Sequence, residues 1–212
     1  METIDLETWD RKALFNNYLE TDFPYIILGA NVDVTNLYDY TKQNGISFYF
    51  AMVYAANEIA NRIKNFRYRF SDGKPYLIDY NKAILTHMQP GSEQFVLIET
   101  ERADNMIEFC RQTARKASEK VENGGFGNLR NQGGAIIYSS VPWVQFTCLV
   151  RTVAKDGVDC APKISWGKFG KTDSRLMMPF SLQVHHGLMD GYHVGLYFQQ
   201  GRYLLDSGNP KM

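Results

Sequence analysis

The sequence predicts a mixed α/β fold, a two-layer α/β sandwich in which helices cover a mixed sheet. Apolar residues recur at helical spacing in several long segments, strand-like segments crowd the C-terminal half, and turn signals separate them. No internal repeat and no Pro- or Ser-rich linker interrupts the chain. Its 212 residues, 44% of them apolar, are therefore expected to form one domain spanning residues 1–212 around one core.

Helices are predicted where apolar residues return every three or four positions. The predicted helices cover residues 35–44, residues 48–63, residues 103–122 and a final segment that starts near Asp190. The first helix ends at Gly45, which readily adopts a left-handed cap, and Ser47 is a suitable N-cap for the second. In the third, Met106, Phe109 and Cys110 lie on one face, which indicates a helix packed on a core.

Strands are predicted where β-branched and aromatic residues alternate between turn signals. The predicted strands cover residues 25–32, 66–70, 75–79, 84–88, 95–100, 135–139, 143–151, 163–169 and 175–186. Asp72 and Gly73 indicate a hairpin turn between the second and third of them. Residues 123–134 are rich in Gly and Asn and form a loop. Its glycines follow a helix and lack the G-x-G-x-x-G spacing of a nucleotide-binding loop.

The composition excludes several classes of protein. Lys plus Arg and Asp plus Glu are equal at 23 each, so nothing favours nucleic acid or an anionic membrane as partner. The three cysteines form no Cys-x-x-Cys pair, so neither a disulfide framework nor a structural zinc site is indicated. The acidic start lacks the pattern of a signal peptide and no apolar run is long enough to span a bilayer, so a cytoplasmic location is expected.

Residues 183–193 carry the strongest chemical signal. Three of the four histidines stand there, together with Asp190 and two glycines. Histidine is the side chain whose ordinary pKa lies nearest neutral pH, and the preceding strand delivers His186 to a turn. A general base at that place contributes roughly 10²–10⁴ in rate. Because no G-x-S-x-G motif supplies a nucleophile, the pattern favours direct transfer between two bound substrates.

Two other interpretations of this segment stay open. His186, Asp190 and His193 would share one face and could bind a metal if the segment were a continuous helix. Gly187 and Gly191 disfavour that continuity, so we expect no metal. The second alternative is that Asp190 only caps the final helix while the histidines are packed core residues.

Several motifs together resemble a known family. They are Trp9-Asp10-Arg11, Pro142-Trp143-Val144 followed by Phe146, Ala161-Pro162, Met178-Pro179, Gln183-Val184-His185-His186, and Asp190-Gly191 followed by His193-Val194-Gly195. At these spacings, and over essentially its whole length, the chain resembles the chloramphenicol acetyltransferases of the trimeric His-His-x-x-x-Asp-Gly class. The heptad alone also occurs in dihydrolipoyl acyltransferase cores and in peptide-synthetase condensation domains, which are larger.

The resemblance implies a role for each of four residues. His186 matches the catalytic base, which removes the proton from a substrate hydroxyl so that the oxygen attacks acetyl-CoA. Asp190 matches a structural acid that pairs with the N-terminal arginine, here Arg11, and this pair holds the active-site turn. Ser139 matches the serine whose hydroxyl donates to the tetrahedral oxyanion, a contribution of roughly 10²–10³ in kcat.

The resemblance also implies binding residues and partners. Trp143, Ser165 and Phe169 match the side that binds acetyl-CoA, the co-substrate, where Ser165 holds a water and Phe169 packs on adenine. Tyr18, Tyr25 and Ile26 fall in the region that lines the acceptor pocket. The family is a homotrimer with each active site at a subunit interface. The expected partners are therefore acetyl-CoA, a small-molecule acceptor with chloramphenicol foremost, and further copies of the chain, without nucleic acid, membrane or metal.

Two departures from the family pattern concern the acceptor site. Gly187-Leu188-Met189 replaces Ala-Val-Cys between His-His and Asp-Gly, a small apolar exchange that should leave the base intact. Arg151 stands where familiar members carry a leucine against the drug; pointing inward it would disfavour an apolar aryl acceptor, unless a local shift turns it outward. Three functions stay open: acetylation of chloramphenicol, the same chemistry on another hydroxylated small molecule, and a non-catalytic trimeric homologue.

Overall fold

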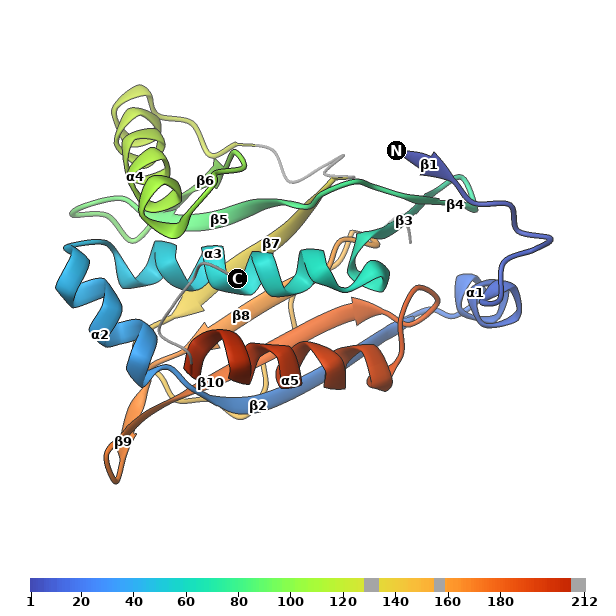
Figure 1. The fold of residues 1–212 in the computed structure, drawn as a ribbon. Coiled ribbons are helices and arrows are strands. Elements are labelled where there is room, and N and C mark those ends of the chain that lie inside the picture. The colour runs from blue at the N-terminus through green and yellow to red at the C-terminus, as the bar shows by residue number, and fades with distance from the viewer. Residues whose placement is uncertain (128–133, 155–158, 207–212) are drawn as a thin grey trace.

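A seven-stranded mixed sheet forms the centre of the molecule in the computed structural model, which describes residues 1–127, 134–154 and 159–206 (Figure 1). The strand order is β2-β10-β8-β7-β5-β6, and β9 pairs with β10. β8, β7 and β5 are parallel neighbours, whereas the other pairs are antiparallel. The strands are β2 (Tyr25–Asp33), β5 (Lys82–Met88), β6 (Phe95–Glu99), β7 (Ala135–Val141), β8 (Lys163–Gly167), β9 (Gly170–Thr172) and β10 (Arg175–His185).

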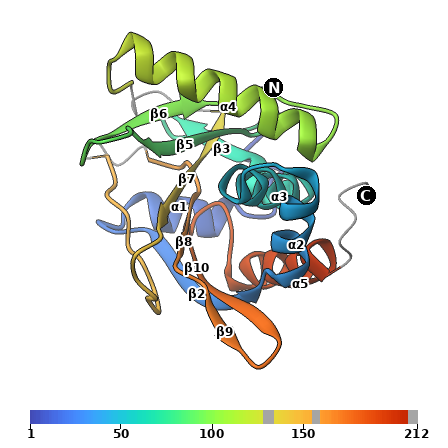
Figure 2. The ribbon, with the colours of Figure 1, turned by 90° about the vertical axis from the view of Figure 1, so that its left-hand side faces the viewer.

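The helices are α1 (Lys12–Leu19), α2 (Thr35–Asn44), α3 (Phe48–Arg62), the short 3₁₀ helix η1 (Lys64–Arg67), α4 (Met106–Asn123) and α5 (Gly191–Asp206). Helices α2, α3, α4 and α5 cover one face of this sheet, as the view along the sheet in Figure 2 shows, whereas α1 lies apart from them near one end of the sheet. A second, small sheet of β1 (Glu2–Thr3), β4 (Lys74–Leu77) and β3 (Tyr68–Ser71) lies near α1 (Figure 1). The mixed α/β fold expected from the sequence is confirmed.

Local sequence signals set several of the element ends. The Ser47 side chain accepts a hydrogen bond from the Phe50 backbone N–H, as an N-cap does, and Gly45 ends α2 in the left-handed conformation with φ 61°. The β3–β4 hairpin turns at Asp72 and Gly73, both with positive φ. These predictions are confirmed, whereas α4 begins three positions later than predicted, because Asn105 caps it. The middle of the loop predicted at 123–134 lies outside the described residues.

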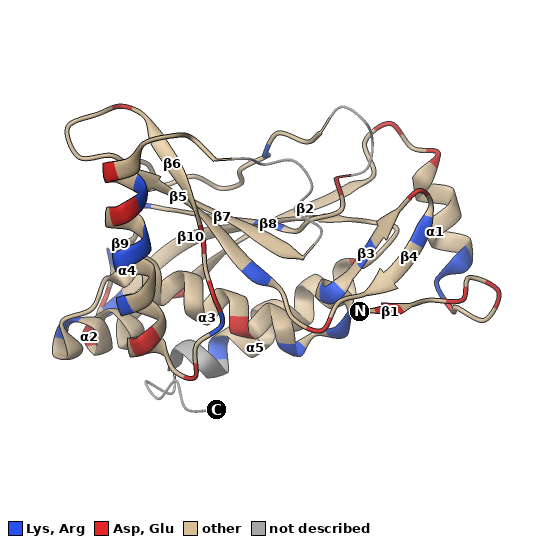
Figure 3. Ribbon diagram, turned by 90° about the horizontal axis from the view of Figure 1, so that it is seen from above, with Lys and Arg blue, Asp and Glu red and all other residues tan. Residues whose placement is uncertain are grey.

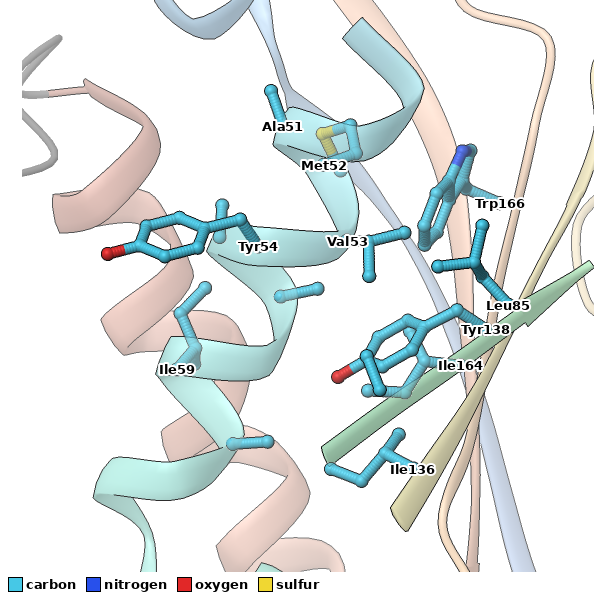
Figure 4. Packing of buried hydrophobic residues seen from close by; sticks show 14 of the residues in the cluster. Ala51, Met52, Val53, Tyr54, Ile59, Leu85, Ile136, Tyr138, Ile164 and Trp166 are labelled. Carbon is cyan, nitrogen blue, oxygen red and sulfur yellow. The ribbon is translucent and has the colours of Figure 1, made fainter. Parts of the chain in front are cut away.

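The main core lies between the helices and the sheet. α3 is buried along almost its whole length, and Figure 4 shows its apolar side chains facing those of β5, β7 and β8. Tyr138 and Ile164 from the sheet, and Val194 and Tyr197 from α5, are all buried in the same cluster. Because side chains alternate along a strand, the neighbours of these core residues must point to the opposite, helix-free face of the sheet. That face carries the polar residues described below.

The strand predicted at residues 143–151 is wrong, because this segment is not a strand in the structure. Its backbone bonds to side chains of β10: Leu149 N–H donates to Ser181 Oγ at 3.2 Å, and Arg151 N–H donates to Gln183 Oε1 at 2.7 Å. Both edges of β10 are already paired, with β2 and with β8. The segment therefore lies on the helix-free face of the sheet, where it appears as the gold chain in Figure 2.

Charged residues of both signs are mixed on the surface. In Figure 3, blue and red alternate along α4, and the strands at the centre of the sheet are mostly tan. This view agrees with a formal net charge of zero. Within the part of the chain that the structure describes, no helix has both the length and the apolar character needed to cross a membrane.

Candidate active site

The turn that follows β10 presents the two adjacent histidines. The His186 backbone N–H donates to the Pro24 carbonyl oxygen at 2.8 Å, so the turn begins against the entry to β2. Leu188 N–H returns to the His185 carbonyl oxygen at 3.0 Å, and Asn65 Nδ2 donates to the Leu188 carbonyl oxygen at 3.0 Å. The turn is therefore fixed by its own backbone bond and by bonds to two other parts of the chain.

The two histidines differ sharply in their surroundings. His185 is 1% exposed, its Nδ1 accepts from the Gly187 N–H at 3.2 Å, and burial lowers the pKa of its imidazole to about 4. His186 keeps 26% of its side chain exposed and stacks on the Tyr18 ring at a centroid separation of 4.1 Å. Its Nδ1 is buried 3.4 Å from Asp190 Oδ1 without a hydrogen bond. The Nε2 atom of His186 is thus the nitrogen that can meet a substrate.

Arg11 and Asp190 form an ion pair behind this turn. Arg11 Nη1 donates to Asp190 Oδ2 at 2.7 Å and Nη2 donates to Oδ1 at 3.1 Å, a bidentate pair. Arg11 also donates to the carbonyl oxygens of His186 and Gly187. The hydrogen bonds from Arg11 hold the pKa of the Asp190 carboxyl below its usual value, so this group stays ionised. With both oxygens engaged, Asp190 can hold the turn but has little capacity to act as a base.

A cluster of hydroxyl groups lies on the helix-free face of the sheet. Ser139 on β7 is opposite Ser165 on β8, and Thr86 Oγ1 donates to Ser139 Oγ at 3.2 Å. Since Ser139 accepts this bond, its own proton remains available to a ligand. Arg151 points inward, toward this cluster: its Nη1 donates to Ser165 Oγ at 3.1 Å. The sequence left two orientations open for Arg151, inward and outward, and the structure has the inward one.

The expected binding residues fall in four places. Trp143 is mostly exposed on the segment over the helix-free face, and Phe169 packs edge-on against Tyr38 and Phe48. The Tyr25 hydroxyl donates to the Asp159 carbonyl oxygen at 2.9 Å, and its ring meets that of His185. Ile26, expected beside Tyr25 at the acceptor pocket, packs instead on the main core, because adjacent strand residues face opposite ways.

One chain does not bring His186 and Ser139 together. Ser139 is opposite Ser165, and Ser165 is opposite Ser181 on β10. From Ser181 to His186 the chain continues along β10, a span of roughly 17 Å. Two strand spacings separate the residues further in the direction across the sheet.

The model of the chloramphenicol acetyltransferase family matches residues 1–200. The chain belongs to this family. A chloramphenicol acetyltransferase from Clostridium perfringens is 30% identical over 95% of this chain and 93% of its own length. A Staphylococcus aureus relative of the same name is 31% identical over 93% of this chain and 95% of its own length. A solved chloramphenicol acetyltransferase superposes with a TM-score of 0.89 at 26% identity, covering 97% of this chain and 100% of its own.

The histidine-rich segment is not arranged as a metal site. His186 and His193 each place Nδ1 within 4 Å of Asp190, but the Asp190 carboxylate is held by Arg11, and His193 Nδ1 accepts from the Asp190 backbone N–H at 3.0 Å. Among the described residues, no three His, Cys, Asp or Glu side chains gather closely enough to hold an ion.

Sequence reasoning missed three residues that hold the site. Thr86 donates to Ser139, Asn65 holds the turn at Leu188, and Gln183 anchors the segment at Arg151. Thr86 and Gln183 lie on strands at positions that face away from the core, and a polar residue there is ordinarily a surface residue. No local pattern marks Asn65, which lies within η1 and reaches a turn far along the sequence.

Proposed function

We propose that this chain is an acetyl-CoA-dependent O-acetyltransferase, built as one acetyltransferase domain, in which His186 is the general base. The observation that carries this proposal is an accessible imidazole whose orientation is fixed by the Tyr18 ring and by the turn that Arg11 and Asp190 hold. His185 is unsuitable for the role because it is buried and its Nδ1 already accepts a hydrogen bond. A base must be reachable as well as basic.

The proposed reaction needs no covalent enzyme intermediate. His186 Nε2 takes the proton of the acceptor hydroxyl while the oxygen attacks the thioester carbonyl carbon of acetyl-CoA. The carbonyl oxygen becomes an oxyanion, to which the free Ser139 O–H donates. The carbon–sulfur bond then breaks, and the departing thiolate takes the proton from the imidazolium. The products are an acetyl ester and free CoA thiol.

Chloramphenicol is the proposed acceptor because relatives that match this chain over nearly their full length bear its name. A second candidate is another hydroxylated small molecule, and one observation favours it: Arg151 lies inward beside Ser165. Trp143 and Phe169 are the aromatic residues we assign to the acetyl-CoA side, and Ser165 the hydroxyl that holds a water there. Tyr18 and Tyr25, which touch the histidines, are assigned to the acceptor side.

We also propose that the active form is a homotrimer in which His186 of one subunit meets Ser139 of its neighbour. The separation of these two residues within one chain supports this arrangement, because a hydroxyl that stabilises the oxyanion must lie within hydrogen-bond reach of it. Apolar side chains on the segment over the helix-free face support it as well. Trp143, Val144 and Val150 are each more than half exposed in one chain.

The test is release of CoA thiol from acetyl-CoA on addition of chloramphenicol, followed by a panel of other alcohols. We expect His186→Ala to abolish turnover and His185→Ala to retain part of it. Equal loss in both variants would show that the base is wrongly assigned. No thiol release with chloramphenicol but turnover with another alcohol would select the second acceptor. No thiol release with any alcohol would leave the non-catalytic homologue.

A further inference from the structure

Arg151 is held in place by a buried side chain of the central strand. Its backbone N–H donates to Gln183 Oε1 at 2.7 Å, and Gln183 Nε2 donates back to the Arg151 carbonyl oxygen at 3.3 Å. Gln183 is 1% exposed. This reciprocal pair fixes the backbone of an otherwise irregular segment at the one residue that carries the guanidinium.

The guanidinium itself is directed at the hydroxyl cluster. Arg151 Nη1 donates to Ser165 Oγ at 3.1 Å, and Ser165 is 1% exposed and opposite Ser139. Neighbouring strands are about 4.8 Å apart, so the positive charge lies beside the residue that we assign to the oxyanion. Because Ser165 accepts from Arg151, the Ser165 proton is free to reach a ligand in the same place.

This charge has no anionic partner in the chain as described. No carboxylate among the described residues lies within ion-pair distance of Arg151. Asp159 is the acidic residue whose charge acts on Arg151. Both of its carboxylate oxygens already have partners, because Lys163 Nζ lies 2.7 Å from Oδ1 and the Ala154 N–H donates to Oδ2 at 3.0 Å. Burial lowers the pKa of the Arg151 guanidinium, which indicates that its neighbours do not fully compensate the desolvation of this cation.

We propose that Arg151 determines acceptor specificity, and that the preferred acceptor is a hydroxylated small molecule carrying a carboxylate that pairs with this guanidinium. A guanidinium offers five N–H donors in a planar fork that fits a carboxylate, and Ser165 uses one of them. A neutral aryl acceptor would leave the cation desolvated and unpaired. The inference rests on the proposed acetyl transfer, and of its two candidate acceptors it selects the second, a hydroxylated small molecule other than chloramphenicol.

The experiment compares acceptors that differ in charge. The probes are chloramphenicol and two analogues that keep both hydroxyls: one has a carboxylate in place of the aryl nitro group, and one has an N-succinyl in place of the N-dichloroacetyl group. We expect wild-type kcat/KM to favour one carboxylate probe over chloramphenicol by about tenfold or more. Arg151→Leu should reverse this preference, and Arg151→Lys should keep most of it. Arg175→Leu, which removes an arginine whose side chain is 70% exposed, should not change it.

Binding of each probe in the absence of acetyl-CoA, measured by calorimetry, separates this inference from the proposed function. If thiol is never released but Arg151→Leu still loses affinity for a carboxylate probe, the acetyl transfer fails and the specificity stands. A wild-type protein that prefers chloramphenicol, or an unchanged preference in Arg151→Leu, overturns the inference. Arg151→Gln gives a second neutral variant should Arg151→Leu fail to fold. Loss of assembly in both, with no carboxylate preference in the wild type, would assign Arg151 to a subunit contact instead.

Discussion

At the scale of single residues, position in the fold gives adjacent identical side chains different chemistry. His185 ends a strand and points into the packed region formed with Tyr25 and Phe70, whereas His186 enters the turn and keeps an accessible edge. The same imidazole is therefore a neutral packing group at one position and a candidate base at the next. The two positions differ in desolvation, and this difference is measurable.

The buried His185 should make stability depend on pH. Its pKa lies near 4 in the folded chain against an ordinary 6.5, so below 6.5 the unfolded state binds a proton that the folded state refuses. The free energy of unfolding therefore falls as pH falls from 6.5 toward 4. Between about pH 7.5 and pH 5 the wild type should lose about 2 kcal/mol more than His185→Asn, measured by urea unfolding at fixed protein concentration. Identical losses would contradict the assignment of His185 as the neutral histidine.

Removing the Ser139 hydroxyl should affect the chemical step. Ser139→Ala is expected to lower kcat roughly 10²–10³-fold with little change in the KM for acetyl-CoA, because the lost donor acts on the oxyanion and not on the bound thioester. Ser140→Ala is the matched control, since Ser140 is the next residue of β7 and faces the other side of the sheet. A similar fall in kcat for both serines would argue against a specific oxyanion donor.

At the scale of elements, α1 and the turn after β10 are joined although they lie at opposite ends of the chain. Arg11, the residue before α1, bonds the turn at Asp190 and at two backbone carbonyl oxygens. Similarly, the segment at 143–151 is joined to β10 by side chains of the strand. The site therefore depends on how elements dock, and each docking can be broken separately.

Arg11→Ala should reduce both stability and rate. The substitution leaves the Asp190 carboxylate and two carbonyl oxygens without their donor, so the free energy of unfolding should fall by about 1–3 kcal/mol. Lys12→Ala is the control, because its ion pair with Glu7 is exposed, and it should cost under about 1 kcal/mol. Thermal unfolding and thiol release measure the two effects. A melting temperature unchanged by Arg11→Ala would exclude the structural pair.

At Gly29 of β2 the segment at 143–151 lies directly against the strand. A Cβ atom there would overlap the Thr147 carbonyl oxygen, so Gly29→Ala must displace the segment and should cost about 1–3 kcal/mol of unfolding free energy. Gly195→Ala is the matched control: it lies within α5, has open space around it, and should stabilise by about 0.5–1 kcal/mol. Chemical unfolding compares the two. A stable Gly29→Ala protein would mean that the segment is not tightly seated on the sheet.

At the scale of the whole molecule, the sheet separates the apolar core from the polar residues of the candidate active site. One face packs against helices (Figure 2). The other carries the hydroxyls, Arg151 and exposed apolar residues. A sheet face of this kind is suited to a partner, and the separation of His186 from Ser139 within one chain agrees with the symmetric assembly that we propose.

Mixed assemblies test whether sites are shared between subunits. His186→Ala and Ser139→Ala subunits, each nearly inactive alone, should regain activity when refolded together, because a neighbouring pair can supply one intact His186 and one intact Ser139. Random mixing should restore roughly one quarter of the sites. Thiol release measures the recovery, and sedimentation confirms the assembly size. Mixtures no more active than their components would show that each site is built within one chain.

Much of the fold could be predicted because its signals are local. The alternation in β10, the cap at Ser47 and the turn at Asp72-Gly73 each depend on neighbours in sequence, and each was predicted correctly. The helix α1 was missed because it buries only Phe15 and its first residue lacks a side-chain cap, so neither periodicity nor a cap residue marks it. The strand predicted at 143–151 was wrong because alternation cannot reveal that both edges of its neighbour are occupied.

By itself the sequence determined most of the helices and strands, the family resemblance and the set of side chains able to do chemistry, because these depend on residue type and short spacing. Only the tertiary structure decided which histidine is accessible, that Thr86 donates to Ser139, and that Arg151 points inward onto Ser165. Each of these depends on the register between strands that are distant in the chain. Desolvation and hydrogen bonding follow from that register, and no stretch of neighbouring residues contains it.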